Sequence, residues 1–202
     1  MKRVGVIGLG DMGSGLAKNL IAHGFETTGF DLSAARLRAL AEIGGHAAQS
    51  VAEVAASADA VYVMVMTGDQ AKSVILGPEG LAARMPSGGG IILSATIKPS
   101  EARAIGAAMQ DADVALIDSP VSGGFPGAQS GTLTMMAAGP QQALDQYADV
   151  MQAVSKTIHR VGASAGDGQT VKACLQSLIG SIFSATFEAS ALAAKAGVSG
   201  QG

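Results

Sequence analysis

Hydrophobic and polar positions follow two different periods along the chain. Short apolar runs that stop at glycine or at a polar residue are typical of buried parallel strands. Longer segments with apolar residues three or four positions apart are typical of helices that pack on a sheet. The strands predicted from this pattern span residues 3–8, 26–31, 46–49, 60–66, 90–95, 114–119, 133–139 and 156–162. The predicted helices span residues 11–22, 33–44, 51–56, 69–76, 79–84, 99–110, 140–153 and 168–196.

The order of these elements predicts an α/β fold. Strands that alternate with helices form a parallel, doubly wound sheet. The rhythm changes after residue 119, where a glycine-rich stretch is followed by two strands that flank one helix. The last helical pattern continues without a break for about 45 Å at 1.5 Å per residue. We therefore expect a first domain at residues 1–163 and a separate unit, built on the long helix, at residues 164–202.

Composition excludes several classes of protein. The chain has 202 residues, enough for one good core, and its 48% apolar content is the opposite of the bias of disordered segments. A net charge of −3, with no basic cluster beyond Lys2 and Arg3, gives no electrostatic footprint for nucleic acid. The longest apolar runs are too short to cross a bilayer. We expect neither a nucleic-acid partner nor a membrane partner.

Cysteine and histidine give no sign of a disulfide or a metal site. Cys174 is the only cysteine, so no intrachain disulfide can form, and a reducing cytoplasm is the default location. Its position in the last helix predicts a core residue. His23, His46 and His159 have no partners at metal-ligand spacing. The sequence predicts a cytoplasmic protein without a metal site.

The first glycine motif lies in VIGLGDMGSGLAKNL, residues 6–20, where Gly8, Gly10 and Gly13 have the spacing G-x-G-x-x-G. A strand precedes it and a helix follows, which is the context in which this motif binds a dinucleotide. Gly8 makes the tight turn, Gly10 lets a pyrophosphate approach the backbone, and Gly13 lets the helix lie on the strand. The residues expected to bind the cofactor here are Gly8, Leu9, Gly10, Asp11, Met12 and Gly13.

Asp31 ends the next predicted strand. A carboxylate at this place accepts hydrogen bonds from both ribose hydroxyls and repels a 2′-phosphate, which favours NAD over NADP. Two simpler interpretations stay open. The glycine motif can be a strand-to-helix turn without a ligand, and Asp31 can be a loop cap, because Asp is favoured in turns.

A second glycine-rich stretch, DSPVSGGFPGAQSGTLTMMAAG at residues 118–139, begins where the sixth strand ends. Ligands of open α/β sheets bind at this edge. Ser122 offers a hydroxyl, and Gly123 and Gly124 offer unshielded backbone N–H groups, a combination that suits a carboxylate. A structural turn explains the stretch equally well.

One lysine stands out in TVKACLQSLIG, residues 170–180. On a helix, Lys172 and Gln176 share a stripe between an apolar face and a face of small residues. Small uncharged residues indicate packing against another element, so Lys172 is expected at a seam between two packed faces. The alternatives are that Lys172 extends to solvent or forms an ion pair with Asp118 or Asp167.

Three motifs together carry a resemblance to a known family. They are GLGDMGSGLAKNL (8–20), DSPVSGGFPGAQSGTLTMMAAG (118–139) and GDGQTVKACLQ (166–176), in this order and over nearly the whole chain. The chain resembles the β-hydroxyacid dehydrogenases, the family of 3-hydroxyisobutyrate dehydrogenase and tartronate semialdehyde reductase. The second motif is the most specific of the three. Within the family, DL after the second strand, LSAT and TVK…Q resemble the threonate-type branch, which acts on four-carbon sugar acids.

The resemblance implies a Rossmann sheet that binds NAD, and it implies a role for each matching residue. Lys172 is implied as the general acid/base. Ser122, Gly123 and Gly124 are implied to hold the carboxylate and hydroxyl of the substrate, and Gln176 to orient the substrate oxygen. The further residues implied to line the cofactor are Val65, Met66, Thr67 and Thr96.

The implied reaction is hydride transfer between NAD and the carbinol carbon of a small β-hydroxy acid, either 3-hydroxyisobutyrate-like or a four-carbon sugar acid. Neutral Lys172 accepts the hydroxyl proton, and its ammonium form donates the proton in the reverse direction. A free lysine with a pKa of about 10.4 is a poor base at neutral pH, so burial is expected to lower its pKa.

The chain departs from the family pattern in three respects. Gln176 stands where members often have Asn, which keeps the donors and acceptors but adds a methylene. Leu175 stands where relatives often carry a polar residue. Relatives continue past the long helix into an all-helical second domain, so residues 164–202 are expected to begin such a domain in a shortened chain. We expect a partner copy to cover the apolar face of this helix in a homo-oligomer.

Two other functions stay open. If the second domain is needed for catalysis, the chain is a dinucleotide-binding module with little or no activity. An imine reductase is a relative with different chemistry, but such enzymes usually carry Asp or Tyr in place of Lys172. A 6-phosphogluconate dehydrogenase needs a much longer chain.

Overall fold

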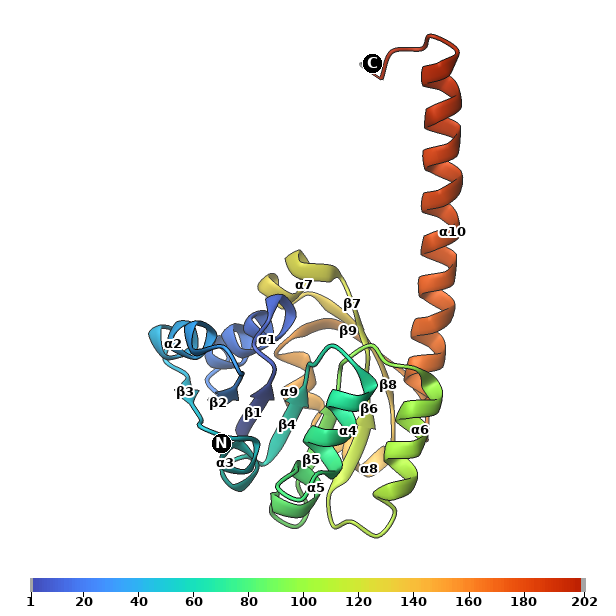
Figure 1. Ribbon diagram of the computed structural model, residues 1–202. Helices are drawn as coiled ribbons and strands as arrows, with labels where there is room; N and C mark the ends of the chain where they lie inside the picture. Colours follow the sequence, from blue (N-terminus) through green and yellow to red (C-terminus); the bar gives the residue numbers. More distant parts are fainter. Residues whose placement is uncertain (1, 201–202) are drawn as a thin grey trace.

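The structure is built on one mixed β-sheet (Figure 1). It is a computed structural model that describes residues 2–200; Met1 and residues 201–202, at the outer ends of the two predicted domains, lie outside this range. Within it, the strands are β1 (Arg3–Ile7), β2 (Glu26–Phe30), β3 (His46–Ala47), β4 (Ala60–Val63), β5 (Gly90–Leu93), β6 (Ala115–Asp118), β7 (Val121–Ser122), β8 (Leu133–Ala138) and β9 (Ser155–Gly162).

The strand order is β3-β2-β1-β4-β5-β6-β8-β7, and β9 pairs with β8. Strands β1 to β6 are parallel. Strand β8 is antiparallel to β6 and β7 but parallel to β9. The chain reverses its direction of progress across the sheet between β1 and β4, which is the switch point where open α/β sheets bind ligands. The predicted α/β class, with a doubly wound and mostly parallel Rossmann sheet, is confirmed.

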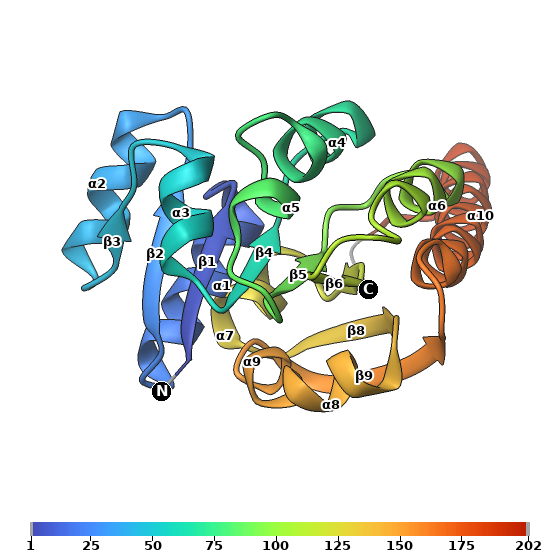
Figure 2. The same cartoon turned by 90° about the horizontal axis from the view of Figure 1, so that it is seen from below.

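Helices cover both faces of the sheet (Figure 2). One face carries α1 (Asp11–Ala22), α2 (Ala34–Glu42), α7 (Gly124–Ser130), α8 (Gln141–Gln146) and α9 (Ala148–Gln152). The other carries α3 (Val51–Ser57), α4 (Gly68–Leu76), α5 (Leu81–Arg84) and α6 (Pro99–Ala108). Each face has its own apolar core, with Leu16 and Leu20 of α1 in the first and Ile75 of α4 and Ile105 of α6 in the second. The two cores hold the strand ends, and therefore the loops above them, in fixed positions.

The sequence pattern misplaced some boundaries. The strands predicted at 60–66 and 90–95 end at Val63 and Leu93. The helix predicted at 140–153 is two helices, because Tyr147 leaves the helical conformation between α8 and α9. The glycine-rich stretch after β6 contains a short strand, β7, and a helix, α7, which the pattern did not predict.

The last helix, α10 (Asp167–Lys195), begins at the sheet and then projects away from it (Figure 1). Beyond Gln176, every residue of α10 except Ile179 is exposed, so the face of small residues that was expected to pack has no cover within residues 2–200. Cys174, expected in the core, is also exposed, because only the first turn and a half of the helix lies against the sheet.

In length and composition α10 is the one helix within residues 2–200 that could cross a membrane. The expectation that every apolar run is too short to cross a bilayer was therefore wrong, as judged by helix length and composition. The reason is that Ala, Leu, Ile and Phe recur along the helix with few charged residues between them, so the helix is apolar on average although no long unbroken run of large apolar residues occurs. A single helix of this kind is weak evidence for a membrane, since a helix that packs on protein satisfies the same criteria.

Candidate active site

A groove of about 690 Å³ lies at the carboxyl ends of β1, β2 and β4, at the switch point of the sheet. Strand ends and the starts of α1, α2 and α4 form its walls. Of the residues predicted to bind a cofactor, those that line the groove are Gly8, Gly10, Asp11, Met12, Gly13, Asp31, Val65 and Met66. Residues from three separate loops are thus brought together at one place.

The turn from β1 into α1 needs glycine at two of its three motif positions. Gly8 has a φ of +89°, and a Cβ atom there would overlap the carbonyl oxygen of Met64. A Cβ atom at Gly13 would overlap the carbonyl oxygen of Gly8, so α1 can lie on β1 only without a side chain there. Gly10 is different. The atoms nearest to a Cβ there would be those of the Arg36 guanidinium, and the nearest of them would lie 3.8 Å away. The fold itself does not require glycine at this position.

Asp31 serves the loop and faces the groove. Its side chain is 9% exposed and accepts hydrogen bonds from the backbone N–H of Leu9 and of Ser33, both at 2.8 Å. The Arg36 guanidinium lies 3.2 Å from one Asp31 oxygen and 3.4 Å from the other. The predicted loop-cap role is therefore present, and the carboxylate also lines the groove. The buried side chain of Leu9 stays outside the groove, and this residue contributes its N–H group to Asp31.

Two residues implied to line the cofactor lie outside this groove. The Thr67 hydroxyl caps α4 by accepting a hydrogen bond from the backbone N–H of Gln70 at 3.2 Å. Thr96 is exposed in the loop after β5. Both follow the carboxyl ends of strands, β4 and β5, and so stand along the same edge of the sheet as the groove.

Lys172 lies in the second turn of α10, buried to 7% exposure. The helix can approach the sheet this closely because of Gly168, where a Cβ atom would lie 2.5 Å from the carbonyl oxygen of Met136 and 2.7 Å from that of Asp118. Residues four apart share a helix face, so Lys172 follows Gly168 on the side that faces the sheet. Burial lowers the pKa of Lys172 below its ordinary value, because desolvation disfavours the ammonium form.

The two simpler interpretations of Lys172 do not match this environment. A side chain that extends to solvent would be largely exposed, whereas that of Lys172 is buried. Within residues 2–200 no ion pair or hydrogen bond joins its ammonium to another residue, Asp118 and Asp167 included. A buried, unpaired lysine is costly and is found mainly where its chemistry is used.

A buried pair that the sequence did not reveal anchors the start of α10. One oxygen of Asp118 accepts hydrogen bonds from the backbone N–H of Gly166 at 2.7 Å and of Gln169 at 3.1 Å, and the other accepts from Gln169 Nε2 at 3.0 Å. The Gln169 amide also donates to the carbonyl of Ala95 and accepts from the N–H of Ile97. These bonds tie α10 to the ends of β5 and β6. Burial raises the pKa of Asp118 although the hydrogen bonds that it accepts act in the opposite direction.

The residues implied to bind substrate belong to two segments that contact β8, the stretch at β7 and helix α10. Ser122 is half-buried in β7 and pairs with Thr134 of β8, and Gly123 and Gly124 are exposed after it. The first turn of α10 packs against Pro120 and β8. Strand β7 and the start of α10 thus contact the same strand. Gln176, one turn beyond Lys172, is exposed. No hydrogen bond joins Lys172 to the glycine stretch within the described part of the chain.

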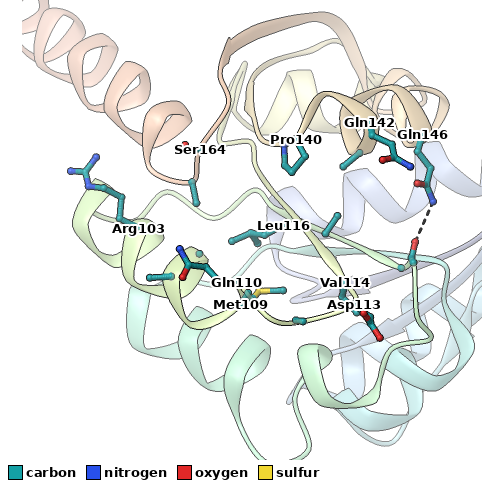
Figure 3. A pocket seen from close by; sticks show the side chains of 18 of the residues that line it. Arg103, Met109, Gln110, Asp113, Val114, Leu116, Pro140, Gln142, Gln146 and Ser164 are labelled. Atoms are coloured by element: carbon teal, nitrogen blue, oxygen red, sulfur yellow. Dashed lines mark hydrogen bonds between the residues drawn. The ribbon is translucent and has the colours of Figure 1, made fainter.

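A second hollow, of about 750 Å³, lies at the opposite edge of the sheet (Figure 3). Gly89 before β5, Val114 before β6 and Gln146 of α8 are among the residues that line it. It opens because β6 and β8 pair only at Asp118 and Ala138 and then diverge. None of the predicted site residues lines this hollow, and within residues 2–200 no group of three or more His, Cys, Asp or Glu could hold a metal ion.

Comparisons with known proteins agree with this geometry. The sequence model of a family described as the NAD binding domain of 6-phosphogluconate dehydrogenase matches residues 3–162. An L-threonate dehydrogenase of Cupriavidus necator is 39% identical over 98% of this chain and 66% of its own length. An NAD-dependent L-serine dehydrogenase of Pseudomonas aeruginosa is 35% identical over 95% of this chain and 64% of its own length.

A crystal structure of 3-hydroxyisobutyrate dehydrogenase from Salmonella typhimurium superimposes with a TM-score of 0.90 at 36% identity, covering 98% of this chain and 69% of that one. The chain spans slightly less than two thirds of the length of the curated relatives named here. Because the family model covers most of the chain, the chain belongs to the family of the NAD binding domain of 6-phosphogluconate dehydrogenase, and the relatives named here include hydroxyacid dehydrogenases of the kind that its three motifs resemble.

Proposed function

We propose that this chain is the dinucleotide-binding part of an NAD-dependent dehydrogenase that acts on a small β-hydroxy acid, with Lys172 as the general acid/base. The observation that carries the proposal is the buried, unpaired Lys172, held by α10 beside the carboxyl end of the sheet. Burial lowers the pKa of Lys172, and a lowered pKa suits proton transfer near neutral pH. The names of the relatives support hydroxy acids as the substrate class.

The groove at the switch point suits NAD. Helix α1 begins at Asp11 without a side-chain cap, so its first N–H groups are available to a pyrophosphate. The open surface at Gly10 allows that close approach, which explains a glycine that the fold does not need. The Asp31 carboxylate is placed to accept from ribose hydroxyls and to repel a 2′-phosphate, so we propose a preference for NAD over NADP.

The acid/base step follows from the state of Lys172. When bound, NAD supplies a ring that accepts the hydride from the carbinol carbon. The proton of the substrate hydroxyl then passes to the neutral Lys172 amine as the carbonyl forms, and in the reverse direction the Lys172 ammonium returns it. A lowered pKa increases the fraction of neutral amine at neutral pH, so it assists oxidation.

Substrate binding is assigned to the glycine stretch after β7. The Ser122 hydroxyl and the exposed backbone of Gly123 and Gly124 suit a carboxylate. We propose that Gln176 orients the substrate oxygen from α10. We propose L-threonate, 3-hydroxyisobutyrate and L-serine as the candidate substrates, because these acids appear in the names of the relatives.

Assembly belongs to the proposal as well. The exposed large apolar residues of α10 beyond Lys172 are Leu178, Ile182, Phe183, Phe187 and Leu192. Apolar patches of this extent are rarely left bare, and we propose that a second copy of the chain covers them, in the cytoplasm and without a membrane or nucleic acid as partner. Sedimentation tests this point: a dimer or larger species at micromolar concentration is expected, and a clean monomer contradicts it.

The test of the function is turnover of a hydroxy-acid panel together with NAD binding, measured on the same preparation. We expect NAD to bind and at least one of L-threonate, 3-hydroxyisobutyrate and L-serine to be oxidised. NAD binding without turnover of any of them supports the alternative that the chain is a binding module, for which the exposure of Gln176 is the favouring observation. Absence of NAD binding contradicts both functions.

A further inference from the structure

The side-chain amide of Gln169 joins three segments of the chain. It is 1% exposed, and its nitrogen Nε2 donates to the carbonyl of Ala95 at 2.9 Å and to Asp118 at 3.0 Å. Its oxygen accepts from the backbone N–H of Ile97 at 3.1 Å. Both N–H donors of the amide are therefore used inside the protein, and none is left for a substrate or a cofactor. The role of this side chain is to hold its neighbours.

The loop between β5 and α6, residues 94–98, is held as if by a further strand. In a parallel pair of strands, a residue bonds to the carbonyl before and to the N–H after the residue opposite. The Gln169 amide makes this pair of bonds to Ala95 and Ile97, which stand on either side of Thr96. Thr96, implied to line the cofactor, therefore lies in a loop whose backbone is fixed from α10.

The same residue fixes the helix turn that carries Lys172. The backbone N–H of Gln169 donates to Asp118 at 3.1 Å, so its main chain and its side chain bind one carboxylate. Lys172 follows three residues later, about 4.5 Å along the axis at 1.5 Å per residue. Both side chains are buried, on the part of α10 that lies against the sheet. A shift of Gln169 therefore carries Lys172 with it.

We propose that Gln169 is a positioning residue that fixes Lys172 relative to the loop of Thr96, an inference that rests on the proposed function. Proton transfer needs the amine within hydrogen-bond reach of the substrate hydroxyl while the carbinol carbon faces the cofactor. The amine belongs to α10 and the loop follows β5, and the Gln169 amide bonds one to the other. Its removal is expected to slow the chemical step and to leave nucleotide binding nearly unchanged, because the groove is built from β1, β2 and β4 and the helices after them.

A purely structural role for Gln169 gives a different result. In that case the loss of its amide lowers the melting temperature, but turnover per folded chain stays the same. A double-mutant cycle adds a second distinction. A residue that acts through Lys172 loses its effect on turnover once Lys172 is gone, whereas independent effects add.

The experiment measures turnover of the three candidate acids by the wild-type chain, Gln169→Met, Lys172→Ala and the double variant, expressed per chain that binds NAD in calorimetric titration. Methionine keeps the length of glutamine and removes its hydrogen bonds. We expect Gln169→Met to lower kcat by about tenfold or more and to leave the NAD dissociation constant within about threefold. In the Lys172→Ala background the same change is expected to alter kcat by less than about twofold.

Tyr62→Phe is the matched control. It also removes a buried hydrogen bond, from the Tyr62 hydroxyl to the carbonyl of Val150 at 3.2 Å, but this bond joins β4 to α9. We expect it to lower the melting temperature and to leave kcat within about threefold of wild type.

Gln169→Glu replaces Gln169→Met if the latter does not fold. It keeps the length of the side chain and the acceptor for Ile97, and it loses the N–H donors to Ala95 and Asp118. We expect it to lower kcat by about threefold or more, again only where Lys172 is present.

An unchanged kcat in a folded Gln169 variant, or the same loss with and without Lys172, overturns the inference while turnover by the wild type still supports the proposed function. A wild type that binds NAD but oxidises none of the acids contradicts the proposed dehydrogenase instead, and with it any positioning of a catalytic group.

Discussion

The two parts of the proposed site are held in place by different means. The cofactor groove is shaped by backbone: Gly8 turns at a positive φ, and α1 lies on β1 because Gly13 has no side chain. The start of α10, which carries Lys172, is held by buried side chains, with Asp118 and Gln169 linking three segments. An added Cβ atom at Gly8 or Gly13 would therefore overlap backbone in the groove, whereas the loss of the Asp118 acceptor would leave buried donors at the start of α10 unpaired.

Within residues 2–200, the two parts also differ in how far other residues enclose them. The groove has walls from three loops, whereas α10 is exposed from Gln176 onward except at Ile179. Lys172 is buried and lies on α10 just before the part of the helix that is exposed. Under the proposed function, cofactor binding would depend on local geometry, and catalysis would depend on how α10 is anchored and covered.

The largest effect is expected from Gly13→Ala. Its new methyl group meets the carbonyl of Gly8, and neither backbone can shift at low cost, so we expect a loss of about 4 kcal/mol or more in the free energy of unfolding. Urea denaturation measures this. Gly10→Ala is the matched control: its stability is expected within about 0.5 kcal/mol of wild type, with NAD binding weakened about tenfold. Similar stabilities for the two variants contradict the distinction between fold-required and ligand-required glycine.

The next largest effect is expected from Asp118→Ala. Three donors lose their acceptor in a buried place, which costs about 3 kcal/mol in the free energy of unfolding at about 1 kcal/mol each. Asp118→Asn keeps one oxygen for the two backbone N–H groups, so we expect a smaller loss. Thermal unfolding of both variants tests this order. Equal and small losses would show that α10 is anchored by other contacts.

Much of the fold could be predicted because its signals are local. Apolar runs and helical spacing give the sheet class directly, and the spacing of Gly8, Gly10 and Gly13 within one turn predicts a groove whose geometry is set by neighbouring residues. The Asp31–Arg36 contact is also local, five residues apart, and the charge pattern could have revealed it.

The parts that were missed depend on contacts between distant residues. Asp118 and Gln169 are 51 positions apart, and no period or motif spacing links them. Helix α7 was missed because glycine and proline obscure its pattern; packing on α1 stabilises it, where the Asn19 amide donates to the carbonyl of Ala128 at 2.8 Å. The exposure of Cys174 could not be predicted either, since a sequence does not show where a helix leaves its sheet.

A smaller effect on stability is expected from Lys172→Met. A buried ammonium without a partner is replaced by an apolar chain, so we expect the melting temperature at neutral pH to rise by roughly 2–4 °C, or about 1 kcal/mol. Burial lowers the pKa of Lys172 in the folded chain, so the unfolded chain binds more protons between the two pKa values and wild-type stability rises with pH there.

The Lys172→Met variant lacks this rise, and melting curves from neutral pH to about pH 11 measure it. Lys195→Met, at the exposed far end of α10, is the matched control and is expected to stay within about 0.5 kcal/mol of wild type at every pH. A lower melting temperature for Lys172→Met at neutral pH would show that the ammonium has a stabilising partner.

The most direct test of the central claim is the rate of hydroxy-acid oxidation by Lys172→Ala, with its NAD dissociation constant measured on the same sample. Loss of a general base in a site whose cofactor groove is intact predicts turnover about 100-fold or more below wild type. The groove is built from other elements, so the NAD dissociation constant is expected within about threefold of wild type. Turnover equal to that of wild type would contradict the assignment of Lys172 as the acid/base.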